Sequence, residues 1–504
     1  MLHDDVLLDI FDFCLDQDLY DTKQNAESWQ SLVHVCRRWR SVVFGSPYRL
    51  NLRLSCSSGT PVRDTLDVWP ALPLLIWDDE CRTKGLDNII AALEHSDRVN
   101  EIRLGRVSSL YLTKVSAAMQ EPFPALTYLD LWSHDETTPA LPDSFLGGSA
   151  SRLQVLWLNR IPFPGLPKLL LSATRLVDLH LREIPHSGYI SPKTMLTILS
   201  MLTSLRSLRL CFLSPQSHPG LESQLPPSPA RSLLPVLTSL EFKGVSEYLD
   251  DLVAGINAPQ LRKLTITFFN QIVFDLPQFI QFINRTPELK ALAKAHIVFG
   301  QQKGVAEVYL SSQIPSGYAK LRVGILCREF DWQVSSIEQV CTTCLPPLST
   351  LEDLYIYKAP QEACRDPFRG LGRGRRQDWK DNTDNTLWLE LLHSFNAVKN
   401  LYLSKDLAQR IAPVLQQLAG DRNTEVFPTL KNINIFFERD SSWSDSWNSL
   451  EDILHKLLWD PSKEIVDHIE EGIREFVASR QPTSYPITCR YWENAEQDMV
   501  LVDS

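Results

Sequence analysis

Cys341 and Cys344 form a C-x-x-C sequence, the arrangement in this chain that most resembles a metal or redox site. A structural zinc site needs four ligands, and therefore a second such pair or two suitably spaced histidines. The sequence supplies neither, and its 11 histidines do not cluster. We therefore interpret both cysteines as small apolar groups packed in a helix on the convex side of the fold.

A second segment, residues 369–376, combines glycines with arginines in the order R-G-L-G-R-G-R-R. A phosphate-binding loop follows a strand and opens a helix, and neither element flanks these glycines. The segment also lacks the interleaved aromatic residues on which nucleic-acid bases stack. We interpret it as part of a solvated insertion near 359–385, and a role in RNA binding or nuclear import is the weakest alternative.

The remaining chemistry-bearing motifs are absent from the sequence. It contains no G-x-S-x-G nucleophile elbow and no H-E-x-x-H metalloprotease motif. The sequence therefore predicts a protein that is not an enzyme, with no catalytic, cofactor-binding or metal-binding residues.

The composition agrees with a folded protein of the cytoplasm or nucleus. The 504 residues are 44% hydrophobic and 22% charged, and the net charge of -11 disfavours a general nucleic-acid surface. No stretch approaches the roughly 18 apolar residues of a membrane span, and the acidic start does not resemble a secretory signal. The scattered cysteines, including Cys14, Cys36, Cys211 and Cys327, are expected to be buried free thiols of a reducing compartment.

The elements that position these residues follow an internal repeat. The pattern L-x-x-L-x-L, apolar at its three fixed positions, begins at residues 99, 126, 153, 176, 205, 237 and 261, and again at 351, 398 and 430. Among the first seven, the spacing runs from 23 residues (153 to 176) to 32 (205 to 237). This is the period of leucine-rich repeats, whose units bury their leucines only by stacking. The sequence therefore predicts an α/β solenoid, with parallel strands on its concave face and helices or irregular returns on its convex face.

The repeat pattern also divides the chain. We expect a helical segment at 1–48, the solenoid at 49–440, and a C-terminal cap at 441–504 that is helical and then forms a short strand. Insertions are expected near 214–229, near 303–327 as an added hairpin, and near 359–385. The ninth template position, often asparagine, is Ile161 or Ile184 in two of the units. An asparagine ladder is therefore not expected there.

Residues between the core leucines of each strand point to the concave face. Aromatic and arginine side chains are enriched there, and such residues dominate protein-binding hot spots. We therefore predict that this face binds a target protein through Tyr128, Asp130, Trp132, Trp157, His180, Arg182, Arg209, Tyr355, Tyr357 and Tyr402. The alternative is that the hairpin or the insertion folds back over the central part of this face.

The first fifty residues carry two amphipathic helical patterns. Val6, Leu7, Ile10 and Phe11 recur at helical spacing, and a second stripe runs through the sequence V-C-R-R-W at 35–39. Helices this short cannot enclose a core alone, so their apolar faces need a partner. That partner is either the rest of the chain or another protein.

This opening segment resembles an F-box, with His3 where that family usually has proline. In that family the motif docks on the Skp-type adaptor of a cullin ubiquitin ligase. The resemblance implies adaptor contacts through Leu2, Val6, Leu7, Ile10, Phe11, Leu32, Val35, Cys36 and Trp39.

Together with the repeats, the resemblance indicates an F-box and leucine-rich-repeat protein of the kind abundant in fungi. Such a protein is a substrate receptor, with the adaptor and cullin complex at its helices and a target protein, not identified by the sequence, on its repeats. It would have no membrane partner, and nucleic acid is not an expected ligand. The alternative is a non-ligase interaction scaffold whose N-terminal helices only cap the solenoid.

Overall fold

The structure is a computed structural model. It describes residues 2–15, 22–47, 49–79, 85–135, 137–215, 231–269, 275–290, 292–300, 304–311, 320–327, 329–345, 348–359, 385–418, 426–436, 476, 488–491 and 500–501. The chain divides into two compact units, residues 1–222 with 232–237, and residues 223–231 with 238–504. Each unit is described by itself.

The first unit opens with three helices, α1 (Asp4–Leu15), α2 (Thr22–Val35) and α3 (Arg37–Gly45). Asp4 and Asp5 lie in the first turn of α1, where the positive end of the helix dipole favours carboxylates. Cys36 caps α3 by accepting a hydrogen bond from the backbone N–H of Trp39 at 3.4 Å. Both Cys36 and Cys14 are exposed, which corrects the expectation that they are buried.

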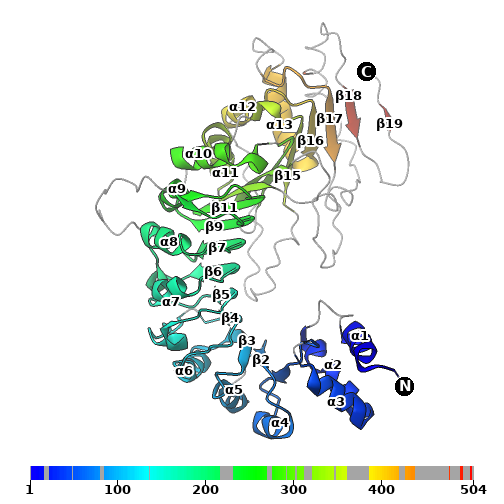
Figure 1. Cartoon of the computed structure of the whole chain (residues 1–504). Helices are drawn as coiled ribbons and strands as arrows, with labels where there is room; N and C mark the ends of the chain where they lie inside the picture. The colour runs from blue at the N-terminus through cyan, green and yellow to red at the C-terminus, as the bar shows by residue number, and fades with distance from the viewer. Residues whose placement is uncertain are drawn as a thin grey trace. The chain divides into compact units, whose positions relative to one another are not determined.

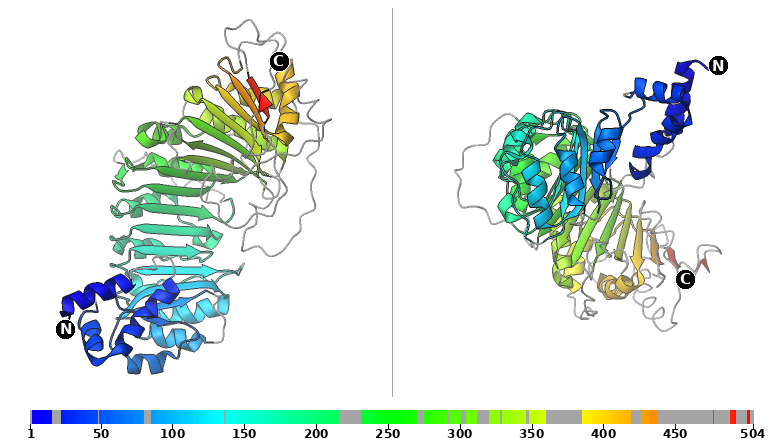
Figure 2. Two further views of the ribbon diagram at one scale, coloured as in Figure 1. Left: turned by 90° about the vertical axis from the view of Figure 1, so that its right-hand side faces the viewer. Right: turned by 90° about the horizontal axis from the view of Figure 1, so that it is seen from below.

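The rest of the first unit is a parallel sheet with helices on one face (Figure 1). Its strands pair in chain order and lie side by side (Figure 2, left), with the bounds β1 (Leu54–Cys56), β2 (Leu74–Asp78), β3 (Val99–Val107), β4 (Tyr128–Ser133), β5 (Val155–Asn159), β6 (Asp178–Ile184) and β7 (Ser207–Phe212). The return segments include α4 (Val62–Val68), α5 (Leu86–Leu93), α6 (Ser109–Ala118), α7 (Leu166–Ser172), α8 (Pro192–Leu199) and short 3-10 turns at Phe145–Gly148 and His186–Gly188. The two-residue strand β8 (Ser232–Leu233) also belongs to this unit.

The repeat template sets the register of this sheet. Leu129, Leu156, Leu179 and Leu208, the second core positions of four units, are aligned across neighbouring strands and fully buried. Their burial between the sheet and the helices forms the continuous apolar spine that the sequence predicts. Each buried leucine contributes roughly 1.5–3 kcal/mol of transfer free energy.

The turns after these strands use left-handed residues. Arg106, Arg160 and Glu183 each stand two residues after the third core leucine, with φ of 51°, 60° and 48°. A non-glycine residue pays a penalty of about 1 kcal/mol in this conformation. The residue that follows Arg106, Val107, is buried, and its carbonyl accepts a hydrogen bond from the Ser133 hydroxyl at 3.1 Å. Such contacts replace the asparagine that is missing at the ninth template position.

The second unit contains a mixed sheet in which parallel pairs predominate. Its strands are β9 (Ser239–Gly244), β11 (Lys263–Phe269), β12 (Lys294–Phe299), β13 (Val305–Ser311), β14 (Leu321–Leu326), β15 (Asp353–Lys358), β16 (Asn400–Ser404), β17 (Asn432–Phe436), β18 (Thr488–Tyr491) and β19 (Val500–Leu501). Its helices are α9 (Ser246–Ala254), α10 (Pro277–Arg285), α11 (Phe330–Gln339), α12 (Asn385–His393) and α13 (Lys405–Leu418), together with the two-residue strand β10 (Ile256–Asn257) and a 3-10 turn at Pro287–Leu289.

The hairpin expected near 303–327 is present, but it lies within the sheet. Strands β12, β13 and β14 form an antiparallel meander, in which β14 pairs parallel with β11 and β12 pairs parallel with β15. The spatial order is therefore β9-β11-β14-β13-β12-β15-β16-β17-β18-β19. The hairpin strands thus continue the sheet and do not cover its face.

A polar ladder crosses β15, β16 and β17. The side-chain amide of Asn400 donates to Asp353 Oδ1 at 2.7 Å, and that of Asn432 donates to Asn400 Oδ1 at 2.6 Å. The three residues are aligned in register. They stand between the first and second core positions of the template, away from the ninth position at which no ladder was expected.

Several expected features lie outside the described residues. These are the proposed loop at 214–229 beyond residue 215, nearly all of the 359–385 insertion with its arginines, and most of the C-terminal cap at 441–504. Within that cap, β18 pairs parallel with β17 and antiparallel with β19, and Phe476 is helical and buried.

Candidate protein-binding surfaces

The three N-terminal helices enclose a small apolar core, which corrects the expectation that helices this short cannot do so. Leu7, Phe11 and Val33 are buried in it together with Val43 of α3. The rings of Phe11 and Trp39 lie 4.7 Å apart with a tilt of 59°, an arrangement in which aromatic rings attract one another. Leu7 and Phe11 therefore already have partners inside the segment, whereas the sequence placed them on an adaptor-binding surface.

The opposite side of α1 carries an exposed apolar row, which we call the α1 stripe. It consists of Leu2, Val6, Ile10 and Phe13, whose side chains are between 41% and 68% exposed. The spacing of Val6, Ile10 and Phe13 places them on one helix face, and Leu2 precedes the helix. Val35, at the end of α2, adds another exposed apolar group at 59%. Phe13 was not predicted, although it stands three residues after Ile10 and shares its face.

The predicted adaptor residues thus fall into three groups. Leu2, Val6, Ile10, Val35 and Cys36 are exposed, Leu32 and Trp39 are half-buried, and Leu7 and Phe11 are buried. Helical spacing alone could not tell which apolar side of each helix faces the internal core.

A separate aromatic cluster joins α2 and α3 to the first repeat. The ring of Trp29 lies 5.1 Å from that of Trp69, and its indole N–H donates to the carbonyl of Arg53 at 2.9 Å. Phe44 and His34 also contact the Trp69 ring, at 6.3 Å and 6.1 Å. Trp29, which the sequence patterns did not single out, is buried here. Part of the helical segment therefore covers the end of the repeats.

The strand face of the first unit carries a connected row of charged and aromatic side chains, which we call the unit 1 row. Glu101 forms ion pairs with Arg53 and, at 3.2 Å, with Arg103. The Arg103 guanidinium lies 4.2 Å from the centre of the Tyr128 ring, and the ring of Trp157 lies 5.7 Å from that of Tyr128. These contacts hold the side chains in fixed positions on an otherwise open face.

The row continues to β6 and β7. The rings of Trp157 and His180 are stacked 4.8 Å apart, and His180 Nε2 lies 3.0 Å from the Ser207 hydroxyl. The indole N–H of Trp157 and the side-chain oxygen of Asn159 have no hydrogen-bond partner among the residues that the structure describes. Buried polar groups usually have one, so these two atoms are unsatisfied polar groups on β5.

Partial burial shifts the pKa values of three side chains in this row. Burial raises the pKa of Asp130 to about 6, and the nearby guanidiniums of Arg103 and Arg182 oppose the rise. Burial lowers the pKa of His180 to about 4, assisted by Arg182, so that its imidazole is neutral at pH 7. Burial also raises the pKa of Tyr128 to about 12.

The other residues predicted for this face are more accessible. Arg182 is exposed, Arg209 is half-buried, and half-buried Trp132 lies beneath the Arg106 guanidinium at 5.7 Å. His180, in contrast, is buried by its stacking on Trp157.

In the second unit, the predicted tyrosines form an internal stack. Tyr355 lies between the rings of His296 and Tyr402, at 4.3 Å and 4.2 Å, with interplanar angles of 5° and 7°. Tyr355 and Tyr357 are buried and pack with Val298. The sequence placed both tyrosines on an open face, and this exposure is corrected by the structure. Burial lowers the pKa of His296 to about 3 and raises that of Tyr357.

The cysteine pair lies in a π-helical turn, Val340–Cys344, at the end of α11. Both thiols are buried, and burial raises the pKa of Cys344 to about 11 and also raises that of Cys341. A thiol with a raised pKa is a poor nucleophile and metal ligand. In the described part of the chain, no three His, Cys, Asp or Glu side chains are grouped to hold a metal ion.

None of the described helices combines the length and apolar character needed to cross a bilayer.

Comparisons with known proteins add little to this description. No protein-family model and no curated protein matches the chain. Among solved structures, the chain is similar to the leucine-rich repeat-containing protein LegL7 from Legionella pneumophila, at 14% identity and a TM-score of 0.26, over 86% of this chain and 100% of that one. The description of the fold rests on the strand register and burial given above.

Proposed function

We propose that this protein is a non-enzymatic interaction protein that works as a substrate receptor of a Skp–cullin–F-box type ubiquitin ligase. In this proposal α1 to α3 dock on the Skp-type adaptor, and the strand face of the repeats binds a target protein, in the cytoplasm or nucleus. The observation that carries it is the α1 stripe. Three apolar side chains on one face of α1, and Leu2 just before the helix, are exposed while the opposite face already has its internal partners.

The stripe favours docking because exposed apolar area is unfavourable in water. Covering it gains roughly 25 cal/mol per Å² of area removed from solvent. An isolated exposed leucine needs no explanation, but an aligned row that includes a phenylalanine marks an interaction site. The proposed adaptor contacts are therefore Leu2, Val6, Ile10 and Val35, with Phe13 added at the end of the stripe and Cys36 beside Val35.

The test is a binding measurement between the full chain and a purified Skp-type adaptor. We expect Val6→Glu with Ile10→Glu to weaken adaptor binding at least tenfold, about 1.4 kcal/mol, because charges cannot enter an apolar contact. Leu110→Glu, at an apolar residue on α6 that is also exposed, is the control and should bind like the unaltered chain. Adaptor binding that survives the double substitution would exclude docking through the stripe.

Truncation of Phe11 or Trp39 would not be a fair test of docking. Both rings pack inside the helical segment, so their loss should unfold it whether or not an adaptor binds.

The proposed target surface is the unit 1 row with its accessible neighbours Trp132, Arg182 and Arg209. Its support is the combination of fixed aromatic and guanidinium groups with two unsatisfied polar atoms on β5. Tyr402 is the remaining predicted contact in the second unit, where it is half-buried beside Tyr355.

A second function, an interaction scaffold with an N-terminal cap, is favoured by the contacts of Trp29 and Trp69. These contacts use a side of the helical segment other than the α1 stripe. If substitutions in the α1 stripe abolish adaptor binding while the solenoid stays folded, the receptor function is supported. If the unaltered chain never binds the adaptor, capping of the repeats remains as the role of these helices.

A further inference from the structure

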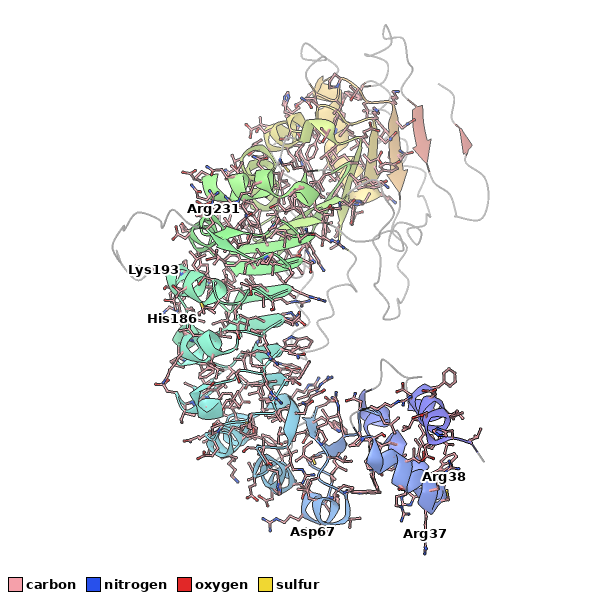
Figure 3. The ribbon with its side chains drawn as sticks, viewed as in Figure 1. Arg37, Arg38, Asp67, His186, Lys193 and Arg231 are labelled. Atoms are coloured by element: carbon pink, nitrogen blue, oxygen red, sulfur yellow. The ribbon has the colours of Figure 1, made fainter. Side chains whose placement is uncertain are left out.

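The acidic side of α1 is held by two arginines from outside the helix. Arg38 on α3 contacts Asp4 Oδ1 through Nη2 at 2.7 Å and through Nε at 3.2 Å, and its Nη2 also donates to the carbonyl of Leu2. Arg49, which follows α3, forms an ion pair with Asp9 and lies 3.9 Å from Asp5. Figure 3 labels Arg38 beside its neighbour Arg37 on the same helix.

These contacts fix α1 at two points along its length. Arg38 holds the start of the helix by its backbone and its first carboxylate, and Arg49 holds Asp5 and Asp9, which stand one turn apart. The Phe11–Trp39 ring contact adds a third point on the face of α1 that carries Asp4, because Phe11 stands seven residues after it. A helix held from two sides in this way has a fixed rotation, and this rotation determines the direction in which the α1 stripe faces.

The carboxylates are not part of the stripe. Asp4 shares the face of Phe11, whereas Asp9 stands three residues after Val6 and borders the stripe. Arg38 therefore acts on the stripe through the orientation of the helix that carries it, and Arg49 holds the helix from the edge of the stripe.

We propose that Arg38 and Arg49 are positioning residues for adaptor docking, which they support by holding the α1 stripe at a fixed rotation. This inference rests on the proposed function. It has a consequence that an apolar interface alone would not have. Salt screens exposed ion pairs, so adaptor binding should weaken as ionic strength rises even though the contacting side chains carry no charge. An apolar contact by itself is not weakened in this way.

The chain contains a matched control for Arg38. Arg37 is the preceding residue on α3, is exposed, and has no hydrogen bond or ion pair within the described ranges. Figure 3 shows its side chain extending away from the helices. Arg37→Ala and Arg38→Ala remove the same charge from adjacent positions, so only the contact with α1 differs between them.

The experiment is a titration of the full-length chain with purified Skp-type adaptor at low and high salt. We expect Arg38→Ala to weaken binding about fivefold at low salt, as loss of an exposed ion pair of about 1 kcal/mol implies, and Arg37→Ala to leave it unchanged. The salt dependence should be shallower in Arg38→Ala than in the unaltered chain. Arg38→Lys should bind at an intermediate strength, because lysine keeps the charge without the planar fork.

A charge exchange separates positioning from a general effect on folding. The double variant Asp4→Arg with Arg38→Asp restores the pair in reverse and should recover most of the lost affinity, with helix content checked by circular dichroism. Equal binding by Arg37→Ala and Arg38→Ala, or no recovery in a folded exchange variant, would overturn the inference. Absence of adaptor binding by the unaltered chain at every salt concentration would instead overturn the proposed function.

Discussion

Asp130 is a carboxylate in an unfavourable position on the strand face. It is aligned with Arg103 on one side and Trp157 on the other, and burial raises its pKa to about 6. The raised pKa means that the folded chain holds this proton at a pH where the unfolded chain, with a pKa near 3.8, has released it. The free energy of unfolding therefore falls as the pH rises from about 4 to about 6.

Asp130→Asn should consequently stabilise the first unit above pH 6. The amide carries no charge at any pH, so the gain reaches at most about 3 kcal/mol and disappears below pH 4. Urea unfolding at a series of pH values measures this, with the exposed Asp97→Asn as a control that should change little. A variant that is less stable than the unaltered chain at pH 8 would contradict the assignment.

At the scale of single residues, the sequence did not predict which side chains of the strand face are buried. The alternation of core and intervening residues correctly placed Tyr128, Trp157 and His180 on one strand face. It could not show that His180 stacks on Trp157, or that Tyr355 would be enclosed by His296 and Tyr402. The template aligns Trp157 with His180 and Tyr355 with Tyr402, but it does not indicate that stacking would bury these rings, and His296 lies in the meander outside the template.

At the scale of secondary-structure elements, the N-terminal helices have two kinds of contact. The α1 stripe faces solvent, whereas Trp29 of α2 is buried against Trp69 beyond the helical segment. The amphipathic patterns predicted α1 and a second helix through the V-C-R-R-W sequence at 35–39, which the structure divides at Cys36 between α2 and α3. Trp29 lies in a polar sequence where a single aromatic residue gives no periodic signal. Its partner Trp69 belongs to a return segment, so only the three-dimensional structure brings the two rings together.

Trp29→Ala should lower the stability of the first unit by about 3–5 kcal/mol, as expected for loss of a buried tryptophan. The loss should also accelerate amide hydrogen exchange in β1, because the indole donates to the Arg53 carbonyl next to that strand. Thermal unfolding and hydrogen exchange measure both effects. The control is Trp332→Ala, at a largely exposed tryptophan of α11, which should change stability by no more than about 0.5 kcal/mol. Unchanged exchange in β1 would show that the helical segment does not cap the repeats.

At the scale of the whole molecule, the repeat architecture was the most predictable feature. The leucine template predicted the strands β3 to β7, β9, β11 and β15 to β17 because each is a short local signal repeated many times. The position of the β12–β13–β14 meander within the sheet was not predictable. A hairpin pattern fixes which two strands pair with each other but says nothing about their outer neighbours.

In the same architecture, each unit is stabilised by its contacts with the neighbouring units. Leu156→Ala in β5 should destabilise the first unit by about 2–5 kcal/mol and increase amide exchange in β4 and β6 as well as in β5. The exposed Leu213→Ala serves as the control and should be nearly neutral. Exchange that increases in β5 alone would indicate that the units are stabilised independently.

The order of strands in the meander also determines when each strand can find its neighbour while the chain is being synthesised. Strand β11 ends at Phe269, but the strand that pairs with it on this side, β14, begins only at Leu321. Until then this edge of β11 has no permanent neighbour. Strand β12 is synthesised before β14, but it lies three places from β11 in the sheet. Nascent protein in this interval therefore exposes an open β-edge to solvent, and it is at this stage of synthesis that a chaperone would matter most.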